Sequence, residues 1–298
     1  MTLEQLRIFI AVAEFEHVTR AAERLGLTQS ATSAAVAALE QRYATPLFDR
    51  IGRRIQLTEA GLLFLTEAKA VVARAAGAEL ILQELSDMRR GTLVVQASQT
   101  IASYWLPRHL VRFRQLYPKI QIRLGIGNTA QVARAVVDGA VDLGFVEGEI
   151  DEVGLTQETI AHDQLLLVVG MTHPWAGRAR VDPHELVETS WVLRETGSGT
   201  RSTFEAALVR LGIQAKALNT AIELPSNESV RMAVEAGIGA AVISELVVTE
   251  SIDRSVLHRV GFDLPRRPFQ VLRHRERHLS RASTAFLQLI CEPKAASA

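Results

Sequence analysis

The spacing of apolar residues changes once along the chain, near Gly91, and this change constrains the fold more than any other feature. Before Gly91, apolar residues such as Leu3, Leu6 and Phe9 recur every three or four positions, which predicts helices. After it, short apolar runs alternate with helical runs. We therefore expect a helical N-terminal part followed by an α/β part. A chain of 298 residues has room for two or three compact units.

The first 57 residues predict short helices joined by tight turns. A helix over about 19–25 is stopped by Gly26, and a third helix follows "LTQS", capped by Thr28 or Ser30, and runs to about Tyr43. Two short helices joined in this way are typical of a helix-turn-helix. Pro46 then opens a turn, and residues 51–57 predict a two-stranded wing with Gly52 at its tip. We expect residues 1–57 to form a winged helix-turn-helix domain.

A local basic patch accompanies this unit, although the net charge of the whole chain is zero. Polar residues in the first turns of the third helix lie where a recognition helix meets base edges, and arginines near the wing suit phosphates. The alternative is a solvated face of an alanine-rich helix. The candidate DNA contacts are Thr28, Gln29, Ser30, Thr32, Ser33, Arg42, Arg50, Arg53 and Arg54.

Residues 58–90 contain no proline and predict one long helix. A spacing of three and four residues suggests a coiled-coil seam, interrupted by Glu79. The seam residues are Leu65, Ala68, Val72, Ala75 and Leu82. We expect a dimerising linker helix, and hence a homodimer or a tetramer.

From residue 91 onward, alternating strands and helices predict an α/β fold with parallel sheets and right-handed crossovers. The expected strands are 92–98, 120–126, 141–148, 165–170, 190–195 and 240–244, and the expected helices are about 102–116, 130–138, 201–211 and 228–236. A change of direction near 162–164 predicts two lobes with a cleft between them. The first lobe would hold 91–162 and 267–298, and the second 163–266.

Polar turns follow several of these strands, among them "RETGSGTR" at 194–201. Each places hydroxyl or amide groups at the start of a helix, where free N–H groups and the helix dipole favour an anion. Serine, threonine and asparagine are also the preferred helix caps, so a single turn of this kind is more often a cap than a site. Their repetition favours a shared anion site at the carboxyl ends of the strands.

Residues 9–61, which include "PLFDRIGRRIQLTEAG", resemble the LysR-type transcriptional regulators. The resemblance departs at Ala34 and Ala35, where many members carry long polar side chains. The segments "QASQTIASYWLPRHLVRFRQLYPKIQIRLGIGNT", "DLGFVEG", "WVLRETGSGTR" and "ELPSNESVRMAVEAGIGAAVIS" are similar to the effector domain of the CysL-like, sulfite-sensing branch of that family.

The resemblance implies a two-lobed domain of the type 2 periplasmic-binding-protein fold that holds a small oxyanion, with sulfite as one candidate. The implied effector contacts are Ser98, Thr100, Thr129, Glu147, Ser198, Gly199, Thr200 and Ser226. A carboxylate beside an anion is repulsive. Either the ligand therefore carries a proton, or Glu147 pairs with Arg201 outside the site.

Other classes of protein are less consistent with the sequence. An enzyme acting on a phosphorylated or sulfated substrate would need a base beside Ser198, and only Glu195 lies nearby in sequence. A transporter's binding protein would carry an export signal, whereas the N-terminus predicts an amphipathic helix. The lone Cys291 suggests a reducing compartment. We expect a cytoplasmic regulator without catalytic residues or membrane spans.

We also expect no metal and no cofactor. His274 and His278 lie among arginines whose positive charge opposes a cation. The expected partners are double-stranded DNA with an interrupted palindromic site, a small anionic effector and a second copy of the chain.

Overall fold

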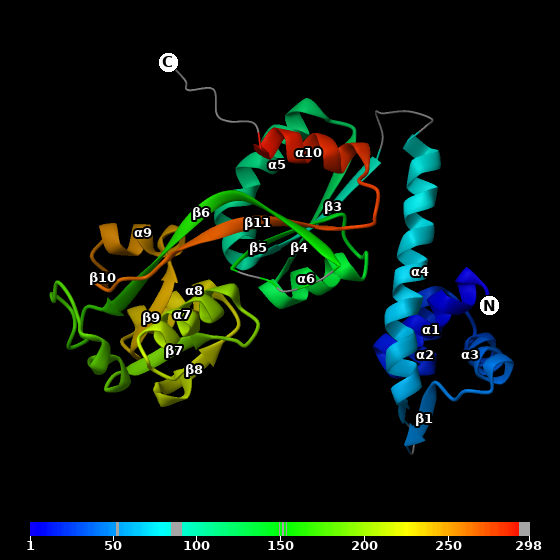
Figure 1. Cartoon of the computed structure of the whole chain (residues 1–298), viewed down its shortest axis with the longest axis horizontal. Helices are drawn as coiled ribbons and strands as arrows, with labels where there is room; N and C mark the ends of the chain where they lie inside the picture. The colour runs from blue at the N-terminus through cyan, green and yellow to red at the C-terminus, as the bar shows by residue number, and fades with distance from the viewer. Residues whose placement is uncertain (52–53, 85–90, 149, 151, 153, 292–298) are drawn as a thin grey trace. The chain divides into compact units, whose positions relative to one another are not determined.

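The computed structural model describes residues 1–51, 54–84, 91–148, 150, 152 and 154–291. The chain separates into two compact units that meet in sequence between Ser86 and Asp87. Figure 1 shows the helices and strands of both units.

The first unit begins with three helices, α1 (Leu3–Phe15), α2 (Val18–Leu25) and α3 (Gln29–Tyr43). Gly26 ends α2 in the left-handed region with φ of 68°, and two residues later Thr28 caps α3. The left-handed backbone at the end of α2 favours glycine, and glycine is the residue found there. A two-stranded antiparallel wing follows, β1 (Phe48–Ile51) and β2 (Arg54–Leu57). The wing begins three residues earlier than predicted, and its predicted tip, Gly52, lies outside the described residues.

The long helix α4 (Glu59–Glu84) occupies the region predicted for the linker. Ala68 is buried, and Leu65 and Val72 pack with it against Leu6, Phe9 and Leu39 of the same unit. Three of the five predicted seam residues therefore belong to the core of their own domain, because this face of α4 covers α1 and α3. The side chains of Glu79 and Leu82 are outside the described part.

The second unit is built on a mixed sheet with the strand order β4-β3-β5-β11-β6-β9-β7-β8. Its strands are β3 (Gly91–Ser98), β4 (Ile120–Gly127), β5 (Leu143–Glu147), β6 (Leu155–Gly170), β7 (Ser190–Arg194), β8 (Asn219–Leu224), β9 (Ala240–Ser244), β10 (Leu257–Val260) and β11 (Arg266–His274). We refer to the β3, β4 and β5 side as lobe I and to the β7, β8 and β9 side as lobe II.

Two long strands join the lobes. The Leu155–Gln164 part of β6 pairs with β11, whereas its Leu165–Val169 part pairs with β9 in lobe II. Strand β11 also pairs with β5 in lobe I. These pairings are antiparallel, while β3 pairs with β4 and β5, and β7 with β8 and β9, in parallel. The expectation of parallel sheets is confirmed for β3 to β5 and for β7 to β9, but it is wrong for β6 and β11, because the chain returns to lobe I through β11.

Helices cover the sheet and start at its polar turns. They are α5 (Leu106–Leu116), α6 (Thr129–Val137), α7 (Gly199–Arg210), α8 (Asn227–Glu235), α9 (Glu245–Asp253) and α10 (Arg281–Cys291), with short 3-10 turns at Pro183–Val187 and Ala215–Ala217. A π-helical turn, Ile101–Trp105, precedes α5. Such turns are frequent at functional sites, and this one directly follows Ser98 and Thr100.

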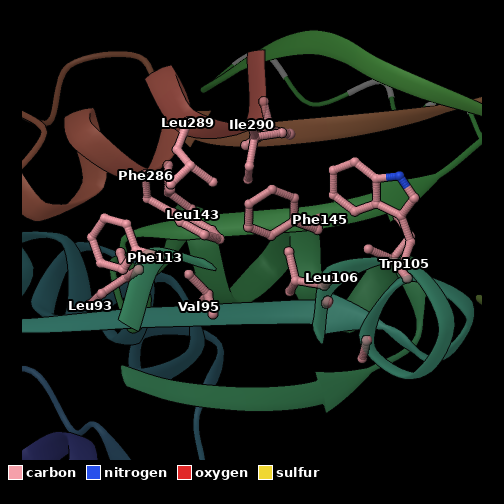
Figure 2. Packing of buried hydrophobic residues seen from close by; sticks show 14 of the residues in the cluster. Leu93, Val95, Trp105, Leu106, Phe113, Leu143, Phe145, Phe286, Leu289 and Ile290 are labelled. Carbon is pink, nitrogen blue, oxygen red and sulfur yellow. The ribbon is translucent and has the colours of Figure 1, made fainter. Parts of the chain in front are cut away.

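Each lobe has its own core. In lobe I, Phe113, Phe145 and Phe286 bring together α5, β5 and α10, and Figure 2 shows these rings interlocking with Leu93 and Val95 of β3. In lobe II, apolar clusters lie on both faces of the sheet. Burial on both faces explains why β5 and β9 are continuous apolar runs in the sequence. The cores fix the strand ends that carry the polar turns.

Candidate functional site

The exposed start of α3 is the candidate DNA interface. The Thr28 hydroxyl accepts a hydrogen bond from the Ala31 N–H at 3.2 Å, so Thr28 rather than Ser30 caps the helix. Gln29 and Ser30 are exposed, and Ser33 is half-buried. These side chains lie in the first turns of α3, where a recognition helix contacts bases.

Thr32 does not belong to this exposed surface. It is fully buried, and its hydroxyl donates to the Thr28 carbonyl at 3.1 Å. Its predicted role in base contact is therefore corrected to a packing role within α3. Further exposed residues of α3 include the alanines Ala34, Ala37 and Ala38. The helical spacing of these alanines is visible in the sequence, but alanine has no polar group that would indicate a contact with DNA.

The basic residues near the wing are described only in part. Arg42 is exposed, and its guanidinium carbon lies 5.7 Å from the ring centroid of Tyr43. Arg53 and the side chains of Arg50 and Arg54 lie outside the described part of the chain.

In the second unit, several predicted effector residues meet around Glu147 at the end of β5. The Ser98 hydroxyl donates to Glu147 Oε2, and the Thr100 hydroxyl donates to Oε1 at 3.2 Å. The Thr129 hydroxyl donates to the Glu147 backbone carbonyl at 3.1 Å. Glu147 itself is buried. The hydroxyl groups that we assigned to an anion therefore surround the protein's own carboxylate.

The charge near this carboxylate is Arg267, not Arg201. Arg267 Nη1 lies 3.6 Å from Glu147 Oε1 and donates to the Thr200 hydroxyl at 3.0 Å. Arg201 instead pairs with Glu205 at 2.7 Å and with Glu223. The predicted alternative of a Glu147–Arg201 pair is wrong, because Arg201 is the third residue of α7 and bonds along its own helix and to β8. Arg267 directly precedes the run "PFQVL" in β11, and a charged residue at the start of such a strand was the available signal for it.

The backbone of Gly199 at the start of α7 approaches lobe I very closely. A Cβ atom at this position would lie 2.2 Å from the Glu147 carbonyl oxygen and 2.6 Å from the Thr129 hydroxyl. Only glycine permits this contact without movement of the lobes. Ser198 and Thr200, on either side of it, are buried.

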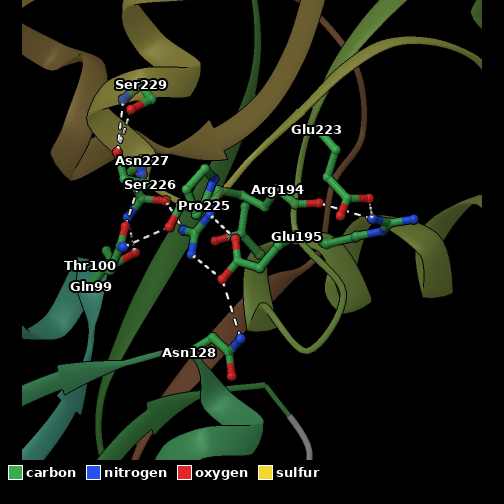
Figure 3. Close-up of polar contacts among 12 residues, drawn as sticks. Gln99, Thr100, Asn128, Arg194, Glu195, Glu223, Pro225, Ser226, Asn227 and Ser229 are labelled. Atoms are coloured by element: carbon green, nitrogen blue, oxygen red, sulfur yellow. Dashed lines mark hydrogen bonds and ion pairs between the residues drawn. The ribbon is translucent and has the colours of Figure 1, made fainter.

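Further contacts between the lobes form a second polar group (Figure 3). The Gln99 amide donates to the Pro225 carbonyl at 2.8 Å, and its oxygen accepts from the Asn227 N–H at 2.9 Å. The Asn227 side chain donates to the Thr100 hydroxyl at 3.0 Å. The Asn128 amide donates to Glu195 at 3.3 Å. These bonds hold the starts of α6 and α8 and the π-helical turn together.

Arg194 binds two members of this polar group, Glu195 and Asn227. It is buried, forms two hydrogen bonds to Glu195 at 2.8 and 2.9 Å, and also donates to Asn227. The Glu195 carboxylate is therefore engaged by a guanidinium and is not placed as a base for Ser198. At the edge, Tyr104 donates to Glu228 at 3.1 Å, and burial together with this carboxylate raises the pKa of Tyr104.

Ser226 has the alternative role of a helix cap. Its hydroxyl accepts from the Ser229 N–H at 3.0 Å and donates to the Ser229 hydroxyl at 2.8 Å, which closes the first turn of α8. Its neighbour Asn227, which is fully buried, makes the contacts to the other lobe instead.

Two family models match the chain in succession. Residues 3–62 match the bacterial regulatory helix-turn-helix protein, lysR family, and residues 86–292 match the LysR substrate binding domain. The chain belongs to the LysR family of transcriptional regulators. The helix-turn-helix of this LysR-type regulator is thus α2 and α3, and its effector-binding domain is the second unit.

Known proteins resemble the regulator over most of its length. The HTH-type transcriptional regulator YeiE of Escherichia coli (strain K12) is 35% identical over 295 residues, which cover 98% of each chain. Full-length CbnR, solved with its target DNA complex, has a TM-score of 0.66 at 21% identity and covers 97% of this chain and 99% of its own. The CcmR regulatory domain of Synechocystis PCC6803, solved with 2-PG, has a TM-score of 0.62 at 27% identity and covers 68% and 96%.

The described part of the regulator contains no helix that is long and apolar enough to span a membrane. It also contains no group of three or more histidine, cysteine, aspartate or glutamate side chains arranged to hold a metal ion.

Proposed function

We propose that the regulator reads DNA with the exposed face of α3 and contacts phosphates with the arginines at 42, 50, 53 and 54. The observation that supports this is the exposure of Gln29 and Ser30 at the start of α3. The exposed alanines at 34, 37 and 38 suit apolar contact with thymine methyl groups, which project into the major groove. We expect a preference for T·A pairs opposite this part of the helix.

A salt titration tests the phosphate contacts. Replacing Arg42 with Gln removes one charge from the exposed end of α3, so it should reduce the slope of log affinity against log salt by about 1. It should do so on specific and random DNA alike. An unchanged slope would remove Arg42 from the interface. The matched control is Arg254→Gln, which directly follows α9 and is an exposed arginine of the other unit.

We further propose that the regulator is controlled by a small oxyanion that carries a proton. Glu147 accepts hydrogen bonds from the hydroxyl groups of Ser98 and Thr100, and it lies close to Gly199 at the start of α7, the end of a helix that favours anions. A ligand that takes over those hydroxyl groups must itself donate to Glu147. A hydrogen-bearing anion meets both demands, since it accepts from Ser98, Thr100 and α7 and donates to the carboxylate.

Sulfite, which is partly protonated near neutral pH, fits this description, and it is the effector we place first, in line with the CysL-like branch. A thermal-shift screen of sulfite, sulfate, thiosulfate, phosphate, 2-PG and small carboxylates tests it, because a ligand that binds the native state raises the melting temperature. The proposal expects sulfite to raise the melting temperature and sulfate, which has no proton near neutral pH, to have little effect. The reverse order would exclude the role given to Glu147.

We propose that two copies pair through α4 and present two α3 helices to an interrupted palindrome, either as a homodimer or as a pair of dimers. Leu62, Leu63 and Val71 support this, because they remain exposed on α4 while Ala68 is buried. The effector would act by favouring one angle between the lobes, and it shifts DNA binding only by its difference in affinity for the two states. Such a regulator acts in the cytoplasm and catalyses no reaction. Turnover assays with phosphate and sulfate esters test the enzymatic alternative.

A further inference from the structure

Arg267 lies where the two joining strands pass from lobe I to lobe II. On β11 it is paired with Asp163 on β6. Its side chain is 1% exposed, and its Nε and Nη2 atoms lie 2.8 and 2.7 Å from Asp163 Oδ2. A charge pair buried this completely is costly to separate, so the contact fixes β6 and β11 to each other at this point.

The same guanidinium reaches both lobes. Its Nη1 atom donates to Thr200 at the start of α7 in lobe II and lies 3.6 Å from Glu147 in lobe I. The other Asp163 oxygen accepts the Ser244 hydroxyl at 2.8 Å, and Ser244 also caps α9 by accepting from the Leu246 N–H. One arginine therefore touches the end of β5, the start of α7 and, through Asp163, the start of α9.

The contact of Arg267 with Glu147 is incomplete. At 3.6 Å the two are within ion-pair distance but beyond a normal hydrogen bond. Arg267 Nη2 is ion-paired with Asp163 Oδ2 at 2.7 Å, but among the described residues it makes no hydrogen bond of normal geometry. Two carboxylates, Glu147 and Asp163, thus share one buried guanidinium that has unused donor capacity. The Glu147 carboxylate accepts from Ser98 and Thr100 while Arg267 lies at ion-pair distance from the same group.

We propose that Arg267 is a positioning residue that couples the effector site to the strands joining the lobes; this inference rests on the proposed site around Glu147. A ligand that takes the hydroxyl groups of Ser98 and Thr100 and donates to one oxygen of Glu147 leaves the other oxygen free to move onto Arg267. The guanidinium then loosens its bond to Thr200, and the start of α7 shifts relative to lobe I. Occupancy of the site is in this way converted into a change of lobe angle.

A distance measurement within the full chain tests the coupling. The native Cys291 on α10 and an added Val209→Cys on α7 place one spin label on each lobe, because Cys291 is exposed and Val209 is 69% exposed. Labelled chains are diluted with unlabelled ones so that each oligomer carries one pair. Pulsed electron spin resonance then gives the distance between lobes, with sulfite as the probe and calorimetry to measure its binding.

The test variant is Arg267→Lys, which keeps the charge but loses the fork of donors. We expect sulfite to bind the wild type and Arg267→Lys alike, but to change the distance only in the wild type. An equal distance change in both would overturn the coupling. Asp163→Asn, which is isosteric, is the second variant if Arg267→Lys fails to fold, with the same two outcomes.

The distances between lobes measured without sulfite test the role of Arg267 independently of the proposed effector. Without sulfite, Arg267→Lys and Asp163→Asn should broaden the distance distribution, because the strands and α7 lose a common anchor. If sulfite binds no variant, the assignment of the effector fails, and a broadened distribution still supports the role of Arg267. Distributions identical to that of the wild type would overturn it whatever the ligand.

Discussion

At the scale of single residues, the close approach of the two lobes depends on Gly199. Its neighbours leave no room for a side chain, and the atoms in the way are a backbone carbonyl and a bonded hydroxyl, so they cannot rotate aside. Ser198, Gly199 and Thr200 were predicted as effector contacts, and they lie in the hydroxyl-rich turn. Arg267 and Asp163 were not, because charged residues separated by a hundred positions meet only through the pairing of β6 with β11.

Replacing Gly199 with alanine should therefore separate the start of α7 from β5. We expect a loss of sulfite affinity of about tenfold or more, equivalent to about 1.4 kcal/mol, with only a modest loss of melting temperature. Calorimetry on the full chain measures it. Gly154→Ala, where a Cβ meets nothing within 4 Å, is the control. Unchanged binding in Gly199→Ala would mean that the lobes need not touch here.

His173 in lobe II gives a prediction for pH dependence. Burial lowers the pKa of His173 below 6.5, and its Nδ1 atom accepts the Trp175 N–H at 3.1 Å, which requires an unprotonated nitrogen. The unfolded chain therefore binds a proton at higher pH than the folded chain does. The stabilisation is complete above pH 6.5 and is lost as the pH falls below it. Melting curves should show a smaller loss of stability between neutral and mildly acidic pH in His173→Asn, whose amide oxygen still accepts the N–H; an equal loss would assign the effect to other groups.

At the scale of elements, buried apolar runs and hydroxyl caps made most of the fold predictable. Strands β3, β5, β7 and β9 are largely buried, and α3 and α8 begin at the hydroxyl residues Thr28 and Ser226. Helix α9, which begins at Ser244, was not predicted. Strand β8, "NTAIEL", was not predicted, because it is exposed along most of its length and carries no apolar run. The antiparallel pairing of β6 and β11 was not predicted either, because it depends on the return of β11 from a distant part of the sequence.

The junction of the wing with α4 makes an element-scale prediction. A Cβ at Gly61 would lie 2.1 Å from the Leu47 carbonyl oxygen. Gly61→Ala should therefore destabilise the DNA-binding unit by about 1–3 kcal/mol through overpacking, although alanine is the better helix former. Thermal unfolding monitored by circular dichroism checks this, with Gly91→Ala as control because its Cβ meets nothing within 4 Å. A gain in stability would mean that the wing does not pack against α4 as described.

At the scale of the whole molecule, one chain contains a helix-turn-helix unit and an α/β unit whose lobes meet around a buried carboxylate. Neither unit alone explains a regulator: we propose that α3 supplies recognition and that the region around Glu147 supplies a response to a ligand. The family relationship establishes a DNA-binding helix-turn-helix domain and a substrate binding domain. The identity of the ligand depends on what Glu147, Ser98 and Thr100 accept, which is a matter of local geometry rather than of fold.

The central claim is that occupancy of the interlobe site changes DNA binding, and a titration of the full chain onto a DNA site selected from a random pool tests it. Fluorescence anisotropy would be measured with and without sulfite for the wild type and Thr200→Val. We predict that sulfite changes the DNA affinity of the wild type alone. An unchanged affinity of the wild type, in the presence of every compound that raises its melting temperature, would contradict the account.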